Sequence, residues 1–367
     1  MEARRRTCNW CGVSFPGPSL YCPACHRYTS SPSDFEGYYQ HGGRRNDYHG
    51  YLPYGVSSNN YATGYTANGW VYQPNNAARV YQVPSWSYTN RTTASGPKRA
   101  VLCGITYKGH RQSLDGSIND VLSMKKLLME KFGFPSASIV VLTEEQDYRH
   151  IPTKKNIRTA LNWLVQGCKP GDSLVFHYSG HGSQVRDHDG DELDGYDESL
   201  LPVDYETEGR ILDDEINATI VRPLPRGATL HSIIDTCFSG TFLDLPNVCR
   251  INRDGYYKWE DQRVAHSAFK GTSGGYAICI SACDDHQNSG DTTAFTGKAT
   301  GALTHSFVQA VEQQPRLTYG HLLLALYRRI SAAREELGLR NNYPHLSQEP
   351  QLSSSHKFDI HSKAFTL

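Results

Sequence analysis

From residue 98 onward, short apolar runs of strand length alternate with amphipathic runs of helical period. Strand-like runs lie at residues 99–105, 138–142 and 173–178. Between them, the stretch that starts at Gly116 and the stretch at 153–165 carry apolar side chains three and four residues apart. This alternation predicts βαβ units and therefore an α/β fold with a parallel sheet. The pattern continues with strands expected at 229–234, 276–281 and near the carboxyl end, and with helices expected at about 302–313 and 318–337.

Two of the expected strands end in turns that carry a nucleophile and a base. Residues 229–234 lead into the turn 235–240, which contains Cys237, and residues 173–178 lead into a turn that contains His181. Ligands of open α/β sheets bind at the carboxyl ends of the strands. A thiol nucleophile needs a neighbouring base or imidazolium, because the thiolate is the reactive form. A buried structural cysteine and a core histidine are the alternative, but two strand-end motifs in this order favour a catalytic pair.

The motifs HYSGHG at residues 177–182 and DTCFSG at residues 235–240 resemble the catalytic motifs of metacaspases, which are caspase-like cysteine peptidases. The histidine of caspases likewise precedes the cysteine by about 50 residues. With its cysteine-rich amino terminus and short connection between halves, the chain resembles a plant type I metacaspase. The resemblance implies a caspase-like three-layer sandwich around a mostly parallel sheet. The chain departs from the family at Phe238, where histidine is usual.

The resemblance also implies roles for single residues. Cys237 would attack the scissile carbonyl as a thiolate, and His181 would protonate the leaving amine. The backbone N–H groups of Cys237 and Gly182 would form the oxyanion hole. Composition and resemblance together divide the chain into a zinc finger at 1–30, an arm at 31–97, a large catalytic half at 98–248, a linker at 249–275 and a small half at 276–367.

Two Cys-x-x-Cys knuckles near the amino terminus predict a structural zinc site. They consist of Cys8 and Cys11, and of Cys22 and Cys25, with glycine and proline in the loop between them. Four thiolates suit a closed tetrahedral zinc ion. Unligated thiols or a redox pair are the alternatives. The segment resembles the LSD-type zinc finger of plant cell-death regulators, and its protein partners would be bound through that finger.

Residues 31–97 are rich in Tyr, Gly, Asn, Ser and Pro and show no persistent apolar period. Such a segment buries too little apolar surface to offset the entropy lost on ordering, so we expect a disordered, prion-like arm that self-associates. A tyrosine surface on which nucleic-acid bases stack is the alternative, but few basic residues accompany the tyrosines.

The charge balance and the cysteines limit the partners and the compartment. Lys plus Arg number 37, as do Asp plus Glu, so the charge favours neither nucleic acid nor an anionic membrane. No apolar run approaches the ~18 residues of a membrane span. Ten cysteines behind a start that lacks a secretory signal predict a reducing compartment, the cytoplasm or alternatively the nucleus.

An acidic run follows the expected histidine, and the metacaspase resemblance places a calcium site on Asp197, Asp213, Asp214 and Asp244. Carboxylate oxygens are ligands that this hard cation prefers. An ion that joins these segments would order the loop beside the catalytic cysteine and make activity depend on calcium. The alternatives are a solvated acidic loop and, for Asp213 and Asp214, an ordinary acid pair at a helix start.

Substrate choice is expected to be cleavage after Arg or Lys. Asp235 precedes Cys237 by two residues and Ser179 precedes His181 by two, so each faces the same side as its catalytic neighbour. The resemblance adds Asp120 as the third pocket residue. Two carboxylates and a hydroxyl suit a guanidinium or ammonium group, although each acid is also a plausible cap of its own loop or helix. Self-cleavage of a zymogen is then expected in the basic linker, at Arg250, Arg253, Lys258, Arg263 or Lys270.

These features predict a calcium-dependent cysteine endopeptidase that acts on protein substrates in regulated cell death or protein quality control. The alternative is a non-enzymatic regulator of cell death, in which the zinc finger and the arm form a scaffold and the caspase-like fold binds partners. The Cys/His pair and the acidic pocket favour the enzyme, because a scaffold needs neither.

Overall fold

The computed structural model divides the chain into two units, residues 1–91 and residues 92–367. The described residues are 5–7, 14–16, 98–236, 239–252, 254–264, 270–282, 291–292, 300–314, 316–336 and 350–367. In the first unit, β1 (Arg5–Thr7) pairs in antiparallel fashion with β2 (Ser14–Pro16). The zinc finger's Cys8, Cys11, Cys22 and Cys25, and the whole arm at 31–97, lie outside the described residues.

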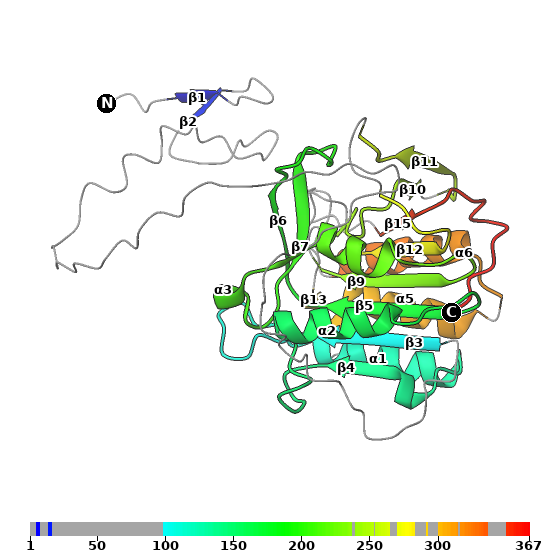
Figure 1. Cartoon of the computed structure of the whole chain (residues 1–367). Helices are drawn as coiled ribbons and strands as arrows, with labels where there is room; N and C mark the ends of the chain where they lie inside the picture. The colour runs from blue at the N-terminus through cyan, green and yellow to red at the C-terminus, as the bar shows by residue number, and fades with distance from the viewer. Residues whose placement is uncertain are drawn as a thin grey trace, which may run out of the picture. The chain divides into compact units, whose positions relative to one another are not determined.

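An eight-stranded sheet forms the centre of the second unit (Figure 1). Its strands are, from one edge to the other, β11 (Tyr257–Asp261), β10 (Asn247–Ile251), β15 (Gln351–Ser354), β12 (Tyr276–Ser281), β9 (Thr229–Asp235), β5 (Ser173–Ser179), β3 (Lys98–Gly104) and β4 (Ile139–Leu142). The neighbours from β12 to β4 pair in parallel, whereas β15, β10 and β11 add antiparallel pairs. The expected α/β fold with a mostly parallel sheet is therefore confirmed.

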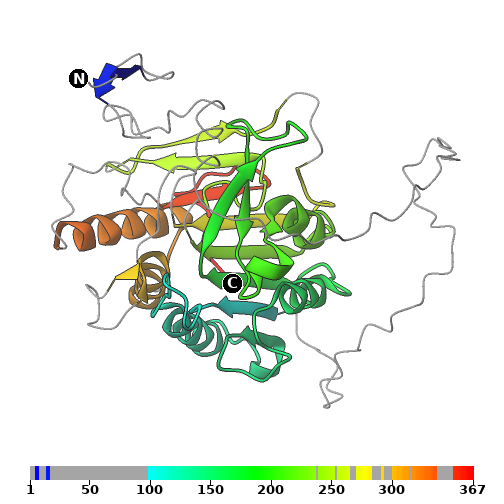
Figure 2. The same cartoon turned by 90° about the vertical axis from the view of Figure 1, so that its left-hand side faces the viewer.

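Helices cover both faces of the sheet and complete the expected three layers (Figures 1 and 2). One face packs against α1 (Ser117–Glu130), α5 (Ala302–Gln313) and α6 (Tyr319–Glu336). The other packs against α2 (Lys154–Val165), α4 (Asp213–Ile216) and the π-helical turn η3 (Asn217–Val221). Ala100 and Leu102 of β3 join the first core, whereas Val101 and Cys103 join the second, because successive strand residues point to opposite faces.

Helix α2 shows how closely the sequence pattern is followed. Thr153 caps its start, and the threonine side chain accepts a hydrogen bond from the backbone N–H of Asn156. Ile157, Leu161 and Leu164 are fully buried, as their spacing predicts. Each such side chain stabilises the fold by about 1.5–3 kcal/mol relative to an exposed one.

A second, smaller sheet follows β5 and was not expected from the sequence. It consists of β6 (Gly182–Arg186), β7 (Tyr196–Leu200) and β8 (Ile211–Leu212), all antiparallel. The loop between β6 and β7 carries the first part of the acidic run. The remaining short elements are η2 (Ser136–Ser138), α3 (Tyr205–Glu208), β13 (Asp291–Thr292) and β14 (Thr300–Gly301).

The stretch at 249–275, expected to be a linker, contains most of β10 and all of β11. The two strands pair with each other, and the side chains of Arg250 and Glu260 contact across them at 2.7 Å. The Asn252 side chain closes the hairpin by accepting hydrogen bonds from the N–H groups of Asp254 and Tyr256. Polar side chains interrupt the apolar residues of both strands, so the sequence shows no apolar run there.

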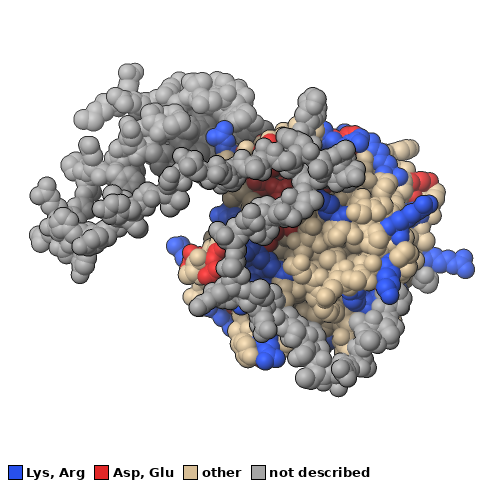
Figure 3. All heavy atoms as spheres, viewed as in Figure 1, with Lys and Arg blue, Asp and Glu red and all other residues tan. Residues whose placement is uncertain are grey.

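Lys and Arg side chains lie at several places on the face shown in Figure 3, some of them next to one another, and the rest of that face is mostly uncharged. In the part of the chain that the structure describes, no helix is long and apolar enough to cross a membrane.

Candidate active site and acidic cluster

Three parallel strands end in register at the edge of the sheet that carries both catalytic motifs. Gly104 of β3 pairs with Ser179 of β5, and Ser179 pairs with Asp235 of β9. A Cβ atom on Gly104 would lie 2.5 Å from the carbonyl oxygen of Ser117, in the first turn of α1. A larger residue would push α1 away, so glycine allows this helix to start directly beside the strand ends.

His181 lies just beyond the end of β5 and is half-buried. Its Nε2 atom lies 2.6 Å from the carbonyl oxygen of Gln112, in the loop before α1. A carbonyl oxygen can only accept a hydrogen bond, so Nε2 carries the proton and Nδ1 is the nitrogen left for proton exchange. The contact holds the ring in one orientation and one tautomer, as a general acid–base group requires.

Two buried tyrosines position the backbone of His181. The Tyr107 hydroxyl accepts the N–H of His181 at 2.9 Å and donates to the carbonyl oxygen of Leu201 at 2.6 Å. The Tyr178 hydroxyl donates to the carbonyl oxygen of His181 at 3.1 Å. Burial raises the pKa of both tyrosines well above the usual value, so their hydroxyls stay protonated. Tyr107 has a left-handed backbone conformation, with φ of 52°, which costs about 1–3 kcal/mol and is maintained by the surrounding structure.

Cys237 lies outside the described residues, so the structure shows the catalytic turn only on either side of it. Thr236 and Ser239 are both buried, and the Ser239 hydroxyl donates to the carbonyl oxygen of Thr236 at 2.9 Å. Gly182 begins β6 immediately after the histidine. Of the expected catalytic groups, the structure therefore describes His181 and Gly182, but neither the thiol nor the N–H of Cys237.

The cysteines that the structure describes do not suit a nucleophile. Cys103, Cys249 and Cys279 are buried, and Cys168 is half-buried. Burial raises the pKa of Cys249 to about 12 and also raises the pKa of the other three thiols. These thiols stay protonated and unreactive at neutral pH.

Asp120, Ser179 and Asp235, the expected substrate pocket, lie together at this edge of the sheet, and all three are buried. The Ser179 hydroxyl donates to Oδ2 of Asp120 at 2.7 Å. Gly301 packs against both acids, since a Cβ atom on it would lie 2.2 Å from Oδ2 of Asp235 and 2.7 Å from Oδ2 of Asp120. Two carboxylates and one hydroxyl therefore share a single site, which we call the carboxylate pair site.

The same two carboxylates anchor the start of α5. Asp120 accepts the N–H of Gly301 at 3.0 Å, and Asp235 accepts the N–H and the hydroxyl of Thr304, both at 2.8 Å. The first N–H groups of a helix have no partner within the helix and carry partial positive charge, so acids stabilise this end. The acids therefore have a structural contact in addition to the substrate contact that the sequence suggested.

Eight further carboxyl groups form three groups, and within each group the carboxylate oxygen atoms lie within 4.8 Å of one another. We call this set the acidic cluster: Asp187, Asp189, Asp191, Glu192, Asp197, Asp213, Asp214 and Asp244. It includes all four residues of the expected calcium site. Its members come from the β6–β7 loop, from β7, from the start of α4 and from the segment after the catalytic turn.

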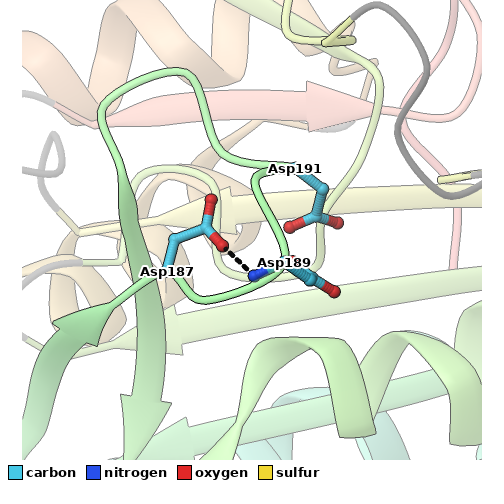
Figure 4. Close-up of side chains that lie close together, drawn as sticks. All are labelled: Asp187, Asp189 and Asp191. Atoms are coloured by element: carbon cyan, nitrogen blue, oxygen red, sulfur yellow. Dashed lines mark hydrogen bonds between the residues drawn. The ribbon is translucent and has the colours of Figure 1, made fainter.

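The first group, Asp187, Asp189 and Asp191, lies in the β6–β7 loop (Figure 4). The Asp187 carboxylate accepts the N–H groups of Asp189, Gly190 and Glu192 at 2.8–2.9 Å and so folds the loop around itself. A hydrogen bond with Asp191 raises the pKa of Asp189 to about 6. The loop thus presents Asp191 toward the rest of the cluster.

The second group, Asp191, Asp197 and Asp214, has carboxylate oxygens without a protein partner. Oδ1 of Asp191 and Oδ1 of Asp197 are buried and accept no hydrogen bond. Burial, followed by the charges of neighbouring acids, raises the pKa of Asp197 and the pKa of Asp214 to about 6. A bound cation would reduce the repulsion among these buried carboxylates and would supply the partner that their oxygens lack.

The third group consists of Glu192, Asp213 and Asp244, and two of its members contact the ammonium group of a lysine. Lys270 contacts Glu192 directly, and its Nζ atom lies 3.3 Å from Asp244. Burial nevertheless raises the pKa of Glu192 to about 7 and the pKa of Asp213 and Asp244 well above the usual value. One ammonium group therefore does not balance the acids around it.

The residues of the acidic cluster fit a hard divalent cation. The carboxylate oxygens that lie close together are ligands that calcium prefers, and two of them, Oδ1 of Asp191 and Oδ1 of Asp197, are buried without a donor. The segment after the catalytic turn is held nearby, because the Thr241 hydroxyl donates to Glu198 at 2.7 Å and the Asn217 amide donates to the Leu243 carbonyl oxygen at 2.8 Å. A cation in the cluster would thus be linked to the turn that contains Cys237.

Sequence analysis missed several residues of these sites. Asp191 and Glu192 were visible only as members of an acidic run, with nothing to separate them from solvated neighbours. Gln112 and Tyr107 lie in an irregular loop, where no period indicates which side chain reaches the histidine. Lys270 lies far along the chain from the acids that it contacts.

Comparisons with known proteins agree with the catalytic motifs. The family model described as "Metacaspase, peptidase C14 domain" matches residues 98–246. Metacaspase-3 of Arabidopsis thaliana is 54% identical over 276 residues, which cover 74% of this chain and 76% of that protein. Metacaspase-1 of the same plant is 53% identical over 290 residues, which cover 74% of this chain and 79% of that protein.

The solved structures that match the fold have low sequence identity to this chain. A protein from Geobacter sulfurreducens is 20% identical with a TM-score of 0.49, and the match covers 73% of this chain and 97% of that one. Caspase-1 from Spodoptera frugiperda is 10% identical with a TM-score of 0.40, and the match covers 74% of this chain and 92% of that one.

Proposed function

The chain belongs to the metacaspase family of cysteine-type peptidases, and we propose that it is an endopeptidase whose catalytic dyad is Cys237 and His181. The observation that carries this proposal is the fixed orientation of His181, whose Nε2 donates to the Gln112 carbonyl oxygen at 2.6 Å. Nδ1 is thereby the ring nitrogen that is left to exchange a proton with Cys237 in the proposed reaction. The histidine backbone is held by two tyrosine hydroxyls, so the ring does not depend on substrate for its position.

In the proposed reaction, Nδ1 of His181 takes the proton of the Cys237 thiol, and the resulting thiolate attacks the carbonyl carbon of the scissile peptide bond. The N–H groups of Gly182 and Cys237 stabilise the oxyanion, and His181 gives a proton to the leaving amine. Water then attacks the thioester, with His181 accepting its proton, and the acid product leaves with the thiol regenerated. Each step balances in protons between the histidine, the thiol and water.

We propose that the substrate residue before the cut is Arg or Lys. The carboxylate pair site supports this, because Asp120 and Asp235 are both buried within reach of one point beside Gly301. Two carboxylates favour a guanidinium or ammonium group through charge-assisted hydrogen bonds, whereas an acidic side chain meets like charge.

We propose that calcium activates the enzyme by binding the acidic cluster through Asp197, Asp213, Asp214 and Asp244. Calcium supplies a double positive charge that relieves the repulsion among these carboxylates. Asp244 directly follows the catalytic turn, so a bound ion would stabilise that turn. A chelator should therefore lower peptidase activity.

We propose that self-cleavage in the basic stretch 249–275 converts a zymogen into the active enzyme. Among the described residues of this stretch, Arg263 is the favoured cleavage site. Its side chain is 66% exposed and lies beyond the end of β11, whereas Lys258 lies within that strand and Lys270 is buried. A peptidase binds its substrate as an extended segment, which a residue paired in a sheet cannot supply. Arg253 lies outside the described residues.

The remaining proposals concern the amino-terminal unit and the biological setting. Zinc bound by Cys8, Cys11, Cys22 and Cys25 would stabilise a finger that recruits protein partners. The enzyme would act in the cytoplasm or the nucleus, in regulated cell death or protein quality control.

The deciding experiment measures hydrolysis of fluorogenic peptides that end in Arg, Lys or Asp by the purified chain, with calcium or with a chelator. We expect Arg and Lys peptides to be cleaved only with calcium and only by chains that retain Cys237 and His181. A folded wild-type chain without activity toward any of these peptides contradicts the proposal and supports a non-enzymatic scaffold.

A further inference from the structure

Lys270 is buried in the acidic cluster, with 8% of its surface exposed. Its Nζ atom lies 3.2 Å from Asp191 and 3.3 Å from Asp244, and it also contacts Glu192. An ammonium group has three donors and no acceptor, so these three carboxylates satisfy it. Lys270 itself lies in the stretch 249–275. Its contacts therefore link this stretch to the β6–β7 loop and to the segment after the catalytic turn.

The lysine is charged in this environment. Burial alone would lower its pKa, but the carboxylates of Asp244 and Glu192 more than compensate and raise the pKa of Lys270 above the usual value. A charged lysine is rarely buried unless it is paired, because removing an ammonium group from water is costly. Lys270 therefore acts as the counter-ion of the cluster when no metal is present.

A divalent cation and the lysine need the same oxygen atoms. Asp244 is one of the proposed calcium ligands, and Lys270 contacts its Oδ1 atom. Calcium binds carboxylate oxygens at about 2.3–2.6 Å. A calcium ion on Asp244 would therefore place its double charge a few ångströms from the ammonium group, and like charges this close repel strongly in a buried site.

We propose that Lys270 is an internal competitor of calcium, which holds the metal-free acidic cluster together and is expelled from it when calcium binds. The proposal rests on the proposed calcium site and adds the residue that the metal must displace. It also states a consequence for the chain: expelling Lys270 frees the end of the 249–275 connection from the acids. Lys270 also lines a pocket of about 650 Å³.

The first test measures the accessibility of the lysine amine directly. The full chain carrying Cys237→Ala, which prevents self-cleavage, is reductively methylated in a chelator or in calcium chloride at matched ionic strength. Mass spectrometry of the peptide that contains Lys270 should show at least tenfold slower modification in the chelator than in calcium. Lys258, whose side chain is 71% exposed, is the internal control and should react equally in both. Equal protection of Lys270 in both conditions overturns the proposal.

The second test compares Lys270→Met with Lys270→Arg in the same Cys237→Ala chain. Calorimetric titration with calcium chloride should show at least tenfold tighter binding to the Met variant, because no internal cation competes. In the chelator, the melting temperature of the Met variant should fall by several degrees, and calcium should restore it. The Arg variant keeps the charge and should stay within about threefold of the parent affinity. Equal or weaker calcium binding by a folded Met variant overturns the proposal.

A second pair of variants tests the proposal even if Lys270→Met alone does not fold without metal, because it removes one negative charge together with the lysine. Glu192→Gln alone is compared with Glu192→Gln combined with Lys270→Met, since Glu192 is not among the four proposed calcium ligands. The double variant should bind calcium more tightly than the single one. The two proposals fail differently: a parent chain that shows no heat of calcium binding refutes the calcium site, whereas a parent that binds calcium while Lys270 stays protected refutes only the competition.

Discussion

The carboxylate pair site and the acidic cluster flank the same catalytic turn, but their acids are stabilised in different ways. Asp120 and Asp235 accept hydrogen bonds from backbone and hydroxyl groups at the start of α5, within the folded chain. Asp191 and Asp197 of the acidic cluster have buried oxygens without a donor, and their neighbours carry raised pKa values. The acids of the first site are therefore held by donors of the folded chain, whereas the second site keeps carboxylate oxygens to which the described residues offer no donor. The proposed role of a cation applies only to the second site.

The largest expected loss of activity comes from the catalytic dyad, which belongs to neither the carboxylate pair site nor the acidic cluster. His181→Ala and Cys237→Ala should each lower kcat/KM by at least about 100-fold, because each removes a group that transfers a proton or forms a bond. Neither side chain belongs to the acidic cluster, so calcium affinity by calorimetry should stay unchanged. Full activity of the purified Cys237→Ala chain would remove the dyad from consideration.

The next effect tests the carboxylate pair site. Asp235→Asn should lower kcat/KM for Arg peptides by about 10- to 100-fold, because a charge-assisted hydrogen bond contributes about 1.5–3 kcal/mol. Activity is measured with peptides that differ only in the residue before the cut. Thr304→Val is the matched control, since it removes the hydroxyl bond to Asp235 and keeps the carboxylate; its loss should stay below tenfold. Full activity of Asp235→Asn on Arg peptides contradicts the assignment.

In the acidic cluster, replacing a carboxylate by a neutral side chain should make the metal-free chain more stable. Asp197→Asn should raise the melting temperature measured in a chelator, because the folded chain raises the pKa of Asp197 to about 6 and ionising it at pH 7.5 costs about 1–3 kcal/mol. The same change should weaken calcium binding at least tenfold. The stability gain should shrink as the pH falls from 7 toward 5, where the folded wild type already holds the proton. A melting temperature that falls in the chelator shows that Asp197 is not repelled by its neighbours.

The smallest effect on activity is expected from the zinc ligands, which belong to neither region. Elemental analysis of the full chain should show one zinc ion per molecule, and Cys8→Ser should lower the zinc content. Peptide hydrolysis by this variant should stay within about twofold of wild type, because its effect is confined to the amino-terminal unit. A metal-free wild-type chain refutes the zinc site.

The sequence predicted those parts of the fold that depend on local pattern. Strands β3, β4, β5, β9 and β12 and helices α1, α2, α5 and α6 are all where apolar period and length placed them, because burial of one face requires that spacing. Strand β11 at the edge of the sheet and its neighbour β10 were missed, because polar residues interrupt the apolar ones in both and leave no apolar run. The small sheet β6–β8 was missed for the same reason.

The sequence alone identified the candidate site residues: His181, Ser179 and Asp235 from their places at strand ends, and Asp120 and the calcium acids from the resemblance to metacaspases. Only the tertiary structure decided how each is used. It placed the Gln112 carbonyl on His181 and the start of α5 on the two pocket acids, and it buried Lys270 among acids that include Glu192, 78 residues earlier, and Asp244, 26 residues earlier. Hydrogen bonds and charge pairs depend on distance in space, and contacts between residues far apart in sequence follow from packing, which no local pattern encodes.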